Sequence, residues 1–109
     1  MKLALGSVLF GQDYGVASPM RRIETASVKE ILSEAARHGI NVVDTAIGYG
    51  SSEEALGRAD VVGWRVVTKL PAVPDNCDNI EGWVFSQTRQ SLHRLRVERL
   101  GGLLLHRPE

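Results

Sequence analysis

The sequence predicts an α/β protein in which short parallel strands alternate with helices. Two observations predict this class. Short, continuously apolar runs recur along the chain, as in the strands of a parallel sheet covered by helices. Segments with helical periodicity separate these runs, and a helical crossover makes consecutive strands parallel. The expected order is strand, helix, strand, helix, strand, helix, strand.

The composition is that of one small folded domain or part of a larger one. The chain has 109 residues, of which 43% are hydrophobic and 24% charged, and its formal net charge is +0. This balance argues against nucleic acid or an anionic membrane as the main partner. Gly6-Ser7 interrupts the first apolar run too early for a signal peptide. The single cysteine, Cys77, suits a reducing cytoplasm.

The first half of the chain contains two expected strands. Leu3 to Leu5 is the first, and a loop rich in Gly, Ser and Asp follows it over residues 7 to 24. Ser27 and Glu30 have the spacing of a capping box, which predicts that a helix begins there. Gly39 is placed to end that helix in a left-handed conformation. The second strand is Ile40 to Val43, and it ends at Asp44.

A short helix and a third strand follow. Ser51 and Glu54 repeat the capping-box spacing, and the helix they open is expected to run to about Leu56 and to end near Gly57. The β-branched run Trp64 to Lys69 predicts the third strand.

The last unit is a longer helix and a fourth strand. The helix is expected to begin at Asn79 or Ile80, and its basic stretch from Arg89 to Arg99 indicates a solvated outer face. Gly101-Gly102 ends this segment, and Leu103 to His106 is the fourth strand.

Three chemically useful side chains end successive strands. Asp44 ends the second strand, Lys69 the third and His106 the fourth, while Tyr49 lies on the turn after the second. Parallel neighbours bring these ends to one edge of the sheet, where α/β proteins bind their ligands. No pair of histidines and acids has the spacing of metal ligands, so no metal site is expected.

These four residues could protonate an oxygen. A phenol is a poor acid at neutral pH, but a nearby ammonium such as that of Lys69 favours the phenolate. Asp44 can pair with Lys69 and orient it, and His106 can donate a hydrogen bond to a substrate oxygen. The combination suits protonation of a carbonyl oxygen as hydride reaches its carbon, and the hydride must come from a cofactor.

Four motifs resemble those of the aldo-keto reductases. They are Leu5-Gly6-Ser7-x-x-Phe10-Gly11, Asp44-Thr45-Ala46-x-x-Tyr49-Gly50, Val67-Thr68-Lys69 and Leu104-Leu105-His106-x-Pro108. The resemblance covers essentially the whole chain in the right order. It implies the first half of a TIM-type (β/α)8 barrel that reduces aldehydes or ketones with NADPH, or sometimes NADH.

The resemblance also implies roles for single residues. Tyr49 matches the general acid of the family's catalytic tetrad, Lys69 and Asp44 its support, and His106 the group that orients the carbonyl. Asp44 is the one residue expected to contact the cofactor, and the remaining contacts are expected outside this chain.

The length of the chain sets a further expectation. A complete barrel takes about 250 residues. Residues 1–109 are therefore expected to form a partial reductase domain, truncated after the fourth strand and inactive alone. Its open sheet edges would permit self-association.

Two other readings remain open. The chain could be a non-catalytic binding or regulatory remnant that kept the site but lost turnover. Alternatively, four strands could form a small flavodoxin-like domain, which requires helices on both faces of the sheet.

Overall fold

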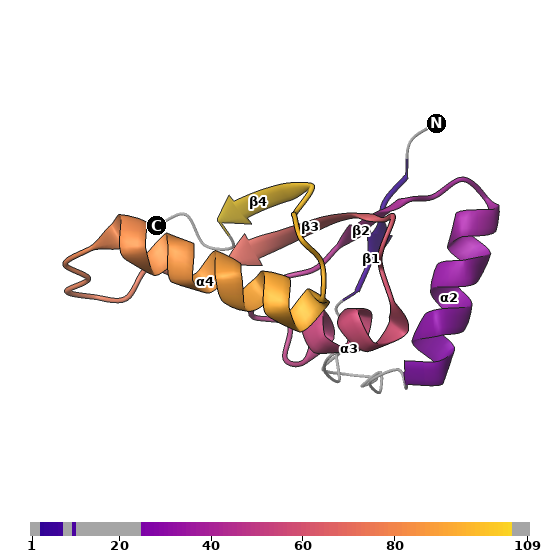
Figure 1. Ribbon diagram of the computed structural model, residues 1–109, viewed down its shortest axis with the longest axis horizontal. Coiled ribbons are helices and arrows are strands. Elements are labelled where there is room, and N and C mark those ends of the chain that lie inside the picture. The colour runs from indigo at the N-terminus through magenta and orange to yellow at the C-terminus, as the bar shows by residue number, and fades with distance from the viewer. Residues whose placement is uncertain (1–2, 8–9, 11–24, 106–109) are drawn as a thin grey trace, which may run out of the picture.

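The computed structural model describes residues 3–7, 10 and 25–105, and its centre is one sheet of four parallel strands (Figure 1). The spatial order is β1-β2-β3-β4, the same as the order along the chain. The strands are β1 (Leu5–Gly6), β2 (Val42–Asp44), β3 (Arg65–Leu70) and β4 (Gly102–Leu105). The predicted parallel α/β class is confirmed.

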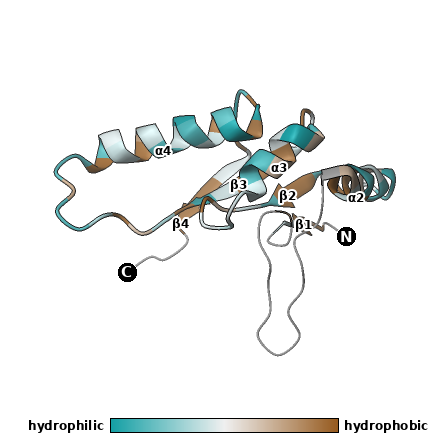
Figure 2. Ribbon diagram, turned by 90° about the horizontal axis from the view of Figure 1, so that it is seen from below, coloured by the Kyte–Doolittle hydropathy of each residue, from teal (hydrophilic) through white to brown (hydrophobic). Residues whose placement is uncertain are grey.

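In residues 25–105, three helices alternate with these strands: α2 (Thr25–Arg37), α3 (Ser52–Ala59) and α4 (Ile80–Leu95). Figure 2 shows α3 and α4 on the same side of the sheet, and none of the described helices covers the opposite face. This one-sided cover is the arrangement of consecutive β/α units in a barrel wall. It does not fit the flavodoxin-like alternative, in which helices lie on both faces.

Several expected boundaries are wrong. Helix α2 already begins at Thr25, so Ser27 and Glu30 lie within its first turns and do not form a capping box there. Ser51 precedes α3 but makes no capping hydrogen bond through its side chain. The spacing of a capping box is short enough to recur by chance, and it cannot distinguish a cap from a first turn.

Other helix ends are confirmed. Gly39 has a φ of +81°, the left-handed conformation expected where α2 ends. Asn79 caps α4, because its Oδ1 accepts a hydrogen bond from the backbone N–H of Gly82 at 3.0 Å.

Gly57 was expected to end α3, but the helix continues to Ala59. A Cβ at Gly57 would overlap the carbonyl oxygen of Arg94 in α4. The glycine is therefore present because two helix backbones approach closely at this point, and it does not serve as a terminator.

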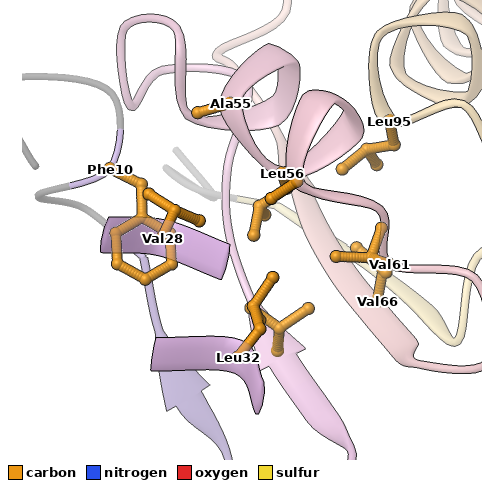
Figure 3. Close-up of a cluster of buried hydrophobic side chains, with 10 residues drawn as sticks. Phe10, Val28, Leu32, Ala55, Leu56, Val61, Val66 and Leu95 are labelled. Carbon is orange, nitrogen blue, oxygen red and sulfur yellow. The ribbon is translucent and has the colours of Figure 1, made fainter. Parts of the chain in front are cut away.

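The core lies between the sheet and the helices. Figure 3 shows Leu56 of α3 between Val28 and Leu32 of α2 on one side and Leu95 of α4 on the other. Leu56, Val28 and Leu95 are fully buried. This cluster joins all three helices and holds them against the sheet.

The fourth strand is less covered. Leu103, Leu104 and Leu105 are 36%, 53% and 54% exposed, although all three are apolar.

In the part of the chain that the structure describes, none of the helices is long and apolar enough to cross a membrane.

Candidate active site

The alternating direction of side chains along β3 determines the face of the sheet from which Lys69 projects. Side chains along a strand point to opposite faces in turn, and Val66, Thr68 and Leu70 are buried on the side of the helices. Lys69 therefore projects from the other face, which the described helices leave uncovered. Asp44, the last residue of β2, pairs in register with Val67, so Lys69 lies two residues further towards the carboxyl end of the sheet.

The ammonium of Lys69 reaches back to the end of β2. Its Nζ donates hydrogen bonds to Asp44 Oδ1 at 2.6 Å and to the carbonyl oxygen of Thr45 at 3.0 Å. The side chain of Lys69 is 15% exposed and that of Asp44 is 39% exposed. A short, charge-assisted bond at a partly buried site fixes the position of the ammonium more firmly than a surface ion pair would.

Tyr49 lies beside the same ammonium. The Nζ of Lys69 is 5.1 Å from the centroid of the Tyr49 ring, within the range of a cation–π contact. The turn is fixed by its backbone, since the N–H of Tyr49 donates to the carbonyl of Ala46 at 3.1 Å. The carbonyl of Tyr49 then accepts from the N–H of Ser52, which starts α3.

The structure thus brings together three of the four expected site residues. Asp44, Tyr49 and Lys69 meet at the carboxyl ends of β2 and β3. The fourth, His106, lies outside the described residues. Within the described residues, no group of three or more His, Cys, Asp and Glu side chains is arranged to hold a metal ion.

One hydrogen-bond acceptor of the Lys69 ammonium was not predicted from the sequence. The carbonyl oxygen of Thr45 accepts from Lys69, and a backbone acceptor leaves no signal in the residue type. Only the register between β2 and β3 could have identified it.

A buried carboxylate was also missed. The side chain of Glu53 is only 3% exposed, and it accepts hydrogen bonds from Thr68 Oγ1 at 2.6 Å and from Arg94 Nε at 2.7 Å. The expectation that the whole basic stretch of α4 is solvated is therefore wrong at Arg94, which turns inward because a buried carboxylate needs a partner.

The geometry can support proton transfer to an oxygen. A phenol lies beside an ammonium that a carboxylate and a backbone carbonyl hold in place. A cation so placed stabilises the phenolate that remains after the phenol has given up its proton.

Comparisons with known proteins show the family and the fold. The model of the aldo/keto reductase family matches residues 2–109. The fold is similar to that of two solved structures from Pseudomonas aeruginosa described as aldo-keto reductases, with TM-scores of 0.78 and 0.76 at 32% and 28% identity. It is also similar to a protein described as a 2,5-diketo-D-gluconic acid reductase B, with a TM-score of 0.63 at 26% identity.

These similarities cover nearly all of this chain and less than half of the others. In each case 96% of this chain is matched, against 42%, 40% and 33% of the three solved structures in the same order. No curated protein matches the sequence.

Proposed function

Since this chain belongs to the aldo/keto reductase family, we propose that it carries the proton-donating centre of a reductase that converts an aldehyde or ketone to an alcohol with hydride from NADPH. The family consists of oxidoreductases that generally use nicotinamide cofactors. The choice of NADPH over NADH, the small-molecule carbonyl substrate and a cytoplasmic location are parts of the proposal.

One observation carries the proposal. The ammonium of Lys69 lies 2.6 Å from a carboxylate oxygen of Asp44 and 5.1 Å from the centroid of the Tyr49 ring. Alone, each residue type is common at strand ends and turns. A phenol, an ammonium and a carboxylate in contact at the carboxyl end of a parallel sheet form an arrangement suited to acid catalysis.

In the proposed step, a carbonyl group is reduced to an alcohol. NADPH, when bound, would supply hydride to the carbonyl carbon from a C–H bond of its dihydronicotinamide and would become NADP⁺, so that the C=O π electrons move to the oxygen. The hydroxyl of Tyr49 gives its proton to that oxygen and becomes a phenolate, which the charge of Lys69 stabilises. Asp44 holds Lys69 in place. His106 is proposed to donate a hydrogen bond to the same oxygen.

The described residues suit only one end of the cofactor. One carboxylate oxygen of Asp44 accepts a hydrogen bond from Lys69, but the side chain is still 39% exposed. The carboxylate can therefore also accept a hydrogen bond from a hydroxyl or amide group beside the nicotinamide. Contacts with the phosphates and adenosine are proposed to come from a longer barrel, because the matched structures are more than twice as long as the segment they share with this chain.

A chimeric barrel tests the proposal. Residues 1–109 replace the matching segment of the P. aeruginosa protein with a TM-score of 0.78, and NADPH oxidation is followed with a panel of aldehydes, ketones and diketo acids. We expect Tyr49→Phe to lower kcat by about 10²–10⁴-fold, the usual contribution of a positioned acid, while NADPH binding persists.

Thr88→Val is the control, since it removes a hydroxyl group from α4 on the helix side of the sheet, and it should leave turnover unchanged. Full turnover in the Tyr49→Phe chimera would refute the assignment. A folded chimera that binds NADPH but reduces none of these compounds would favour a non-catalytic binding module.

A further inference from the structure

Three buried hydroxyl groups form a hydrogen-bonded cluster that contacts the backbone of Asp44. Ser7 follows β1, Thr45 follows β2, and Ser52 is the first residue of α3. Each is at most 1% exposed. Ser52 Oγ lies 2.9 Å from Thr45 Oγ1, 2.9 Å from the carbonyl oxygen of Ser7 and 3.0 Å from Ser7 Oγ.

The number of protons fixes the direction of these bonds. Each hydroxyl has one proton to donate. Ser7 Oγ donates to the carbonyl oxygen of Asp44 at 2.7 Å, and Ser52 Oγ donates towards Ser7. Thr45 must then be the donor in its contact with Ser52. The bonds therefore run in one order, from Thr45 to Ser52, to Ser7 and to the carbonyl of Asp44.

This chain of hydroxyls begins and ends on the segment that holds the ammonium. Lys69 donates one hydrogen bond to the side chain of Asp44 and another to the carbonyl of Thr45. On the sheet side, the N–H of Thr45 donates to the carbonyl of Val67 at 2.8 Å. The Asp44–Thr45 segment is thus held from β3 on one side and by the hydroxyls on the other.

We propose that Ser52 is a positioning residue for Lys69. It links Thr45 to Ser7, and it thereby fixes the segment from which both acceptors of the ammonium come. Loss of its hydroxyl leaves Thr45 Oγ1 and the carbonyl of Ser7 buried without this partner, so the segment shifts to find others. Its hydroxyl bonds to Thr45 and Ser7 and its backbone N–H to the carbonyl of Tyr49, so it acts through the segments that carry the reacting groups.

Chemical protection of Lys69 measures this positioning in the 109-residue chain. The chain has three lysines, Lys2, Lys29 and Lys69, so reductive methylation followed by peptide mass spectrometry gives a separate rate for each. Lys29 is exposed and serves as the internal reference, whereas Lys69 is 15% exposed and doubly hydrogen-bonded. We expect Ser52→Ala to raise the methylation rate of Lys69 about fivefold and to leave that of Lys29 unchanged, because one hydrogen bond contributes on that scale.

Ser91→Ala is the matched control. Ser91 is, like Ser52, a serine that is 0% exposed, but it lies in α4 beside Arg94. It should not change the rate at Lys69, and an equal rise in both variants would overturn the proposal by showing general loosening. Thr45→Val removes the first donor at nearly constant volume and should act like Ser52→Ala. An unchanged Lys69 rate in a folded Thr45→Val chain would overturn the proposal even where Ser52→Ala prevents folding.

The catalytic meaning of this positioning rests on the proposed role of Lys69, but the measurement uses neither NADPH nor a carbonyl compound. If Ser52→Ala raises the methylation rate of Lys69 but the chimera has no turnover, the reductase proposal is refuted and the positioning role of Ser52 is supported. If the chimera is active but Ser52→Ala leaves the methylation rate of Lys69 unchanged, the positioning role is refuted and the reductase proposal is supported.

Discussion

At the scale of single residues, two consecutive positions of β3 take part in two different polar clusters. Thr68 points to the helices and donates to Glu53, while Lys69 points the other way and donates to Asp44. Asp44 could be found in the sequence, because a charged residue directly after an apolar run is visible there. The burial of Glu53 could not, since it depends on how α4 packs over α3 and brings Arg94 within 2.7 Å.

The buried carboxylate should matter for stability. We expect Glu53→Gln to lower the free energy of unfolding by about 2 kcal/mol, because the charge-assisted bonds from Arg94 and Thr68 become weaker neutral ones. Glu54→Gln, on the exposed neighbour, should change it by less than about 0.5 kcal/mol. Urea unfolding followed by circular dichroism measures both. Equal losses in the two variants would show that the Glu53 contacts are not stabilising.

At the scale of elements, the kinds and order of the strands and helices follow from the sequence, but their ends do not. Apolar runs and helical periodicity reflect burial, which spans a whole element. Ends depend on a few local contacts, and Gly57 illustrates the difficulty. A glycine after an apolar turn is typical of a helix end, yet here it permits contact with the backbone of Arg94.

This contact reverses the effect that replacing a helix glycine with alanine usually has on stability. Gly57→Ala inside an exposed helix would stabilise by roughly 0.5–1 kcal/mol. Here the added methyl group meets a carbonyl oxygen that belongs to the backbone, so we expect destabilisation by about 1–3 kcal/mol. Arg58→Ala, at the exposed position next to it, gives the baseline for α3 in the same thermal unfolding measurement. A stabilised Gly57→Ala chain would contradict the close approach of α3 and α4.

At the scale of the whole molecule, the sheet has two edges. Among the described strands, β1 pairs only with β2 and β4 only with β3. The solved structures that share this fold are more than twice as long as the matched segment. We propose that, without further strands, the edge at β4 and its exposed leucines associate with other copies of the chain.

A charge on the edge should weaken this association. We expect the 109-residue chain to sediment as dimers or larger species and Leu104→Lys to shift it towards monomer, since lysine on an edge strand opposes pairing. Val62→Lys is the control, because Val62 is 75% exposed in the turn before β3 and not on the edge. Analytical ultracentrifugation over a range of concentrations decides the matter. A wild-type chain that remains monomeric throughout would contradict the open-edge account.

Tyr49 and Lys69 are proposed to act as one proton-donating unit, and a double-mutant cycle in the chimeric barrel measures whether they do. The turnover of Tyr49→Phe, Lys69→Met and the double variant is measured with NADPH and one aldehyde under the same conditions. Groups that act as a unit give grossly non-additive losses, because removing the second group costs little once the first is gone. We therefore expect the double variant to be no slower than the slower single variant. Two losses that multiply in the double variant would contradict the claim and show that the two side chains contribute independently.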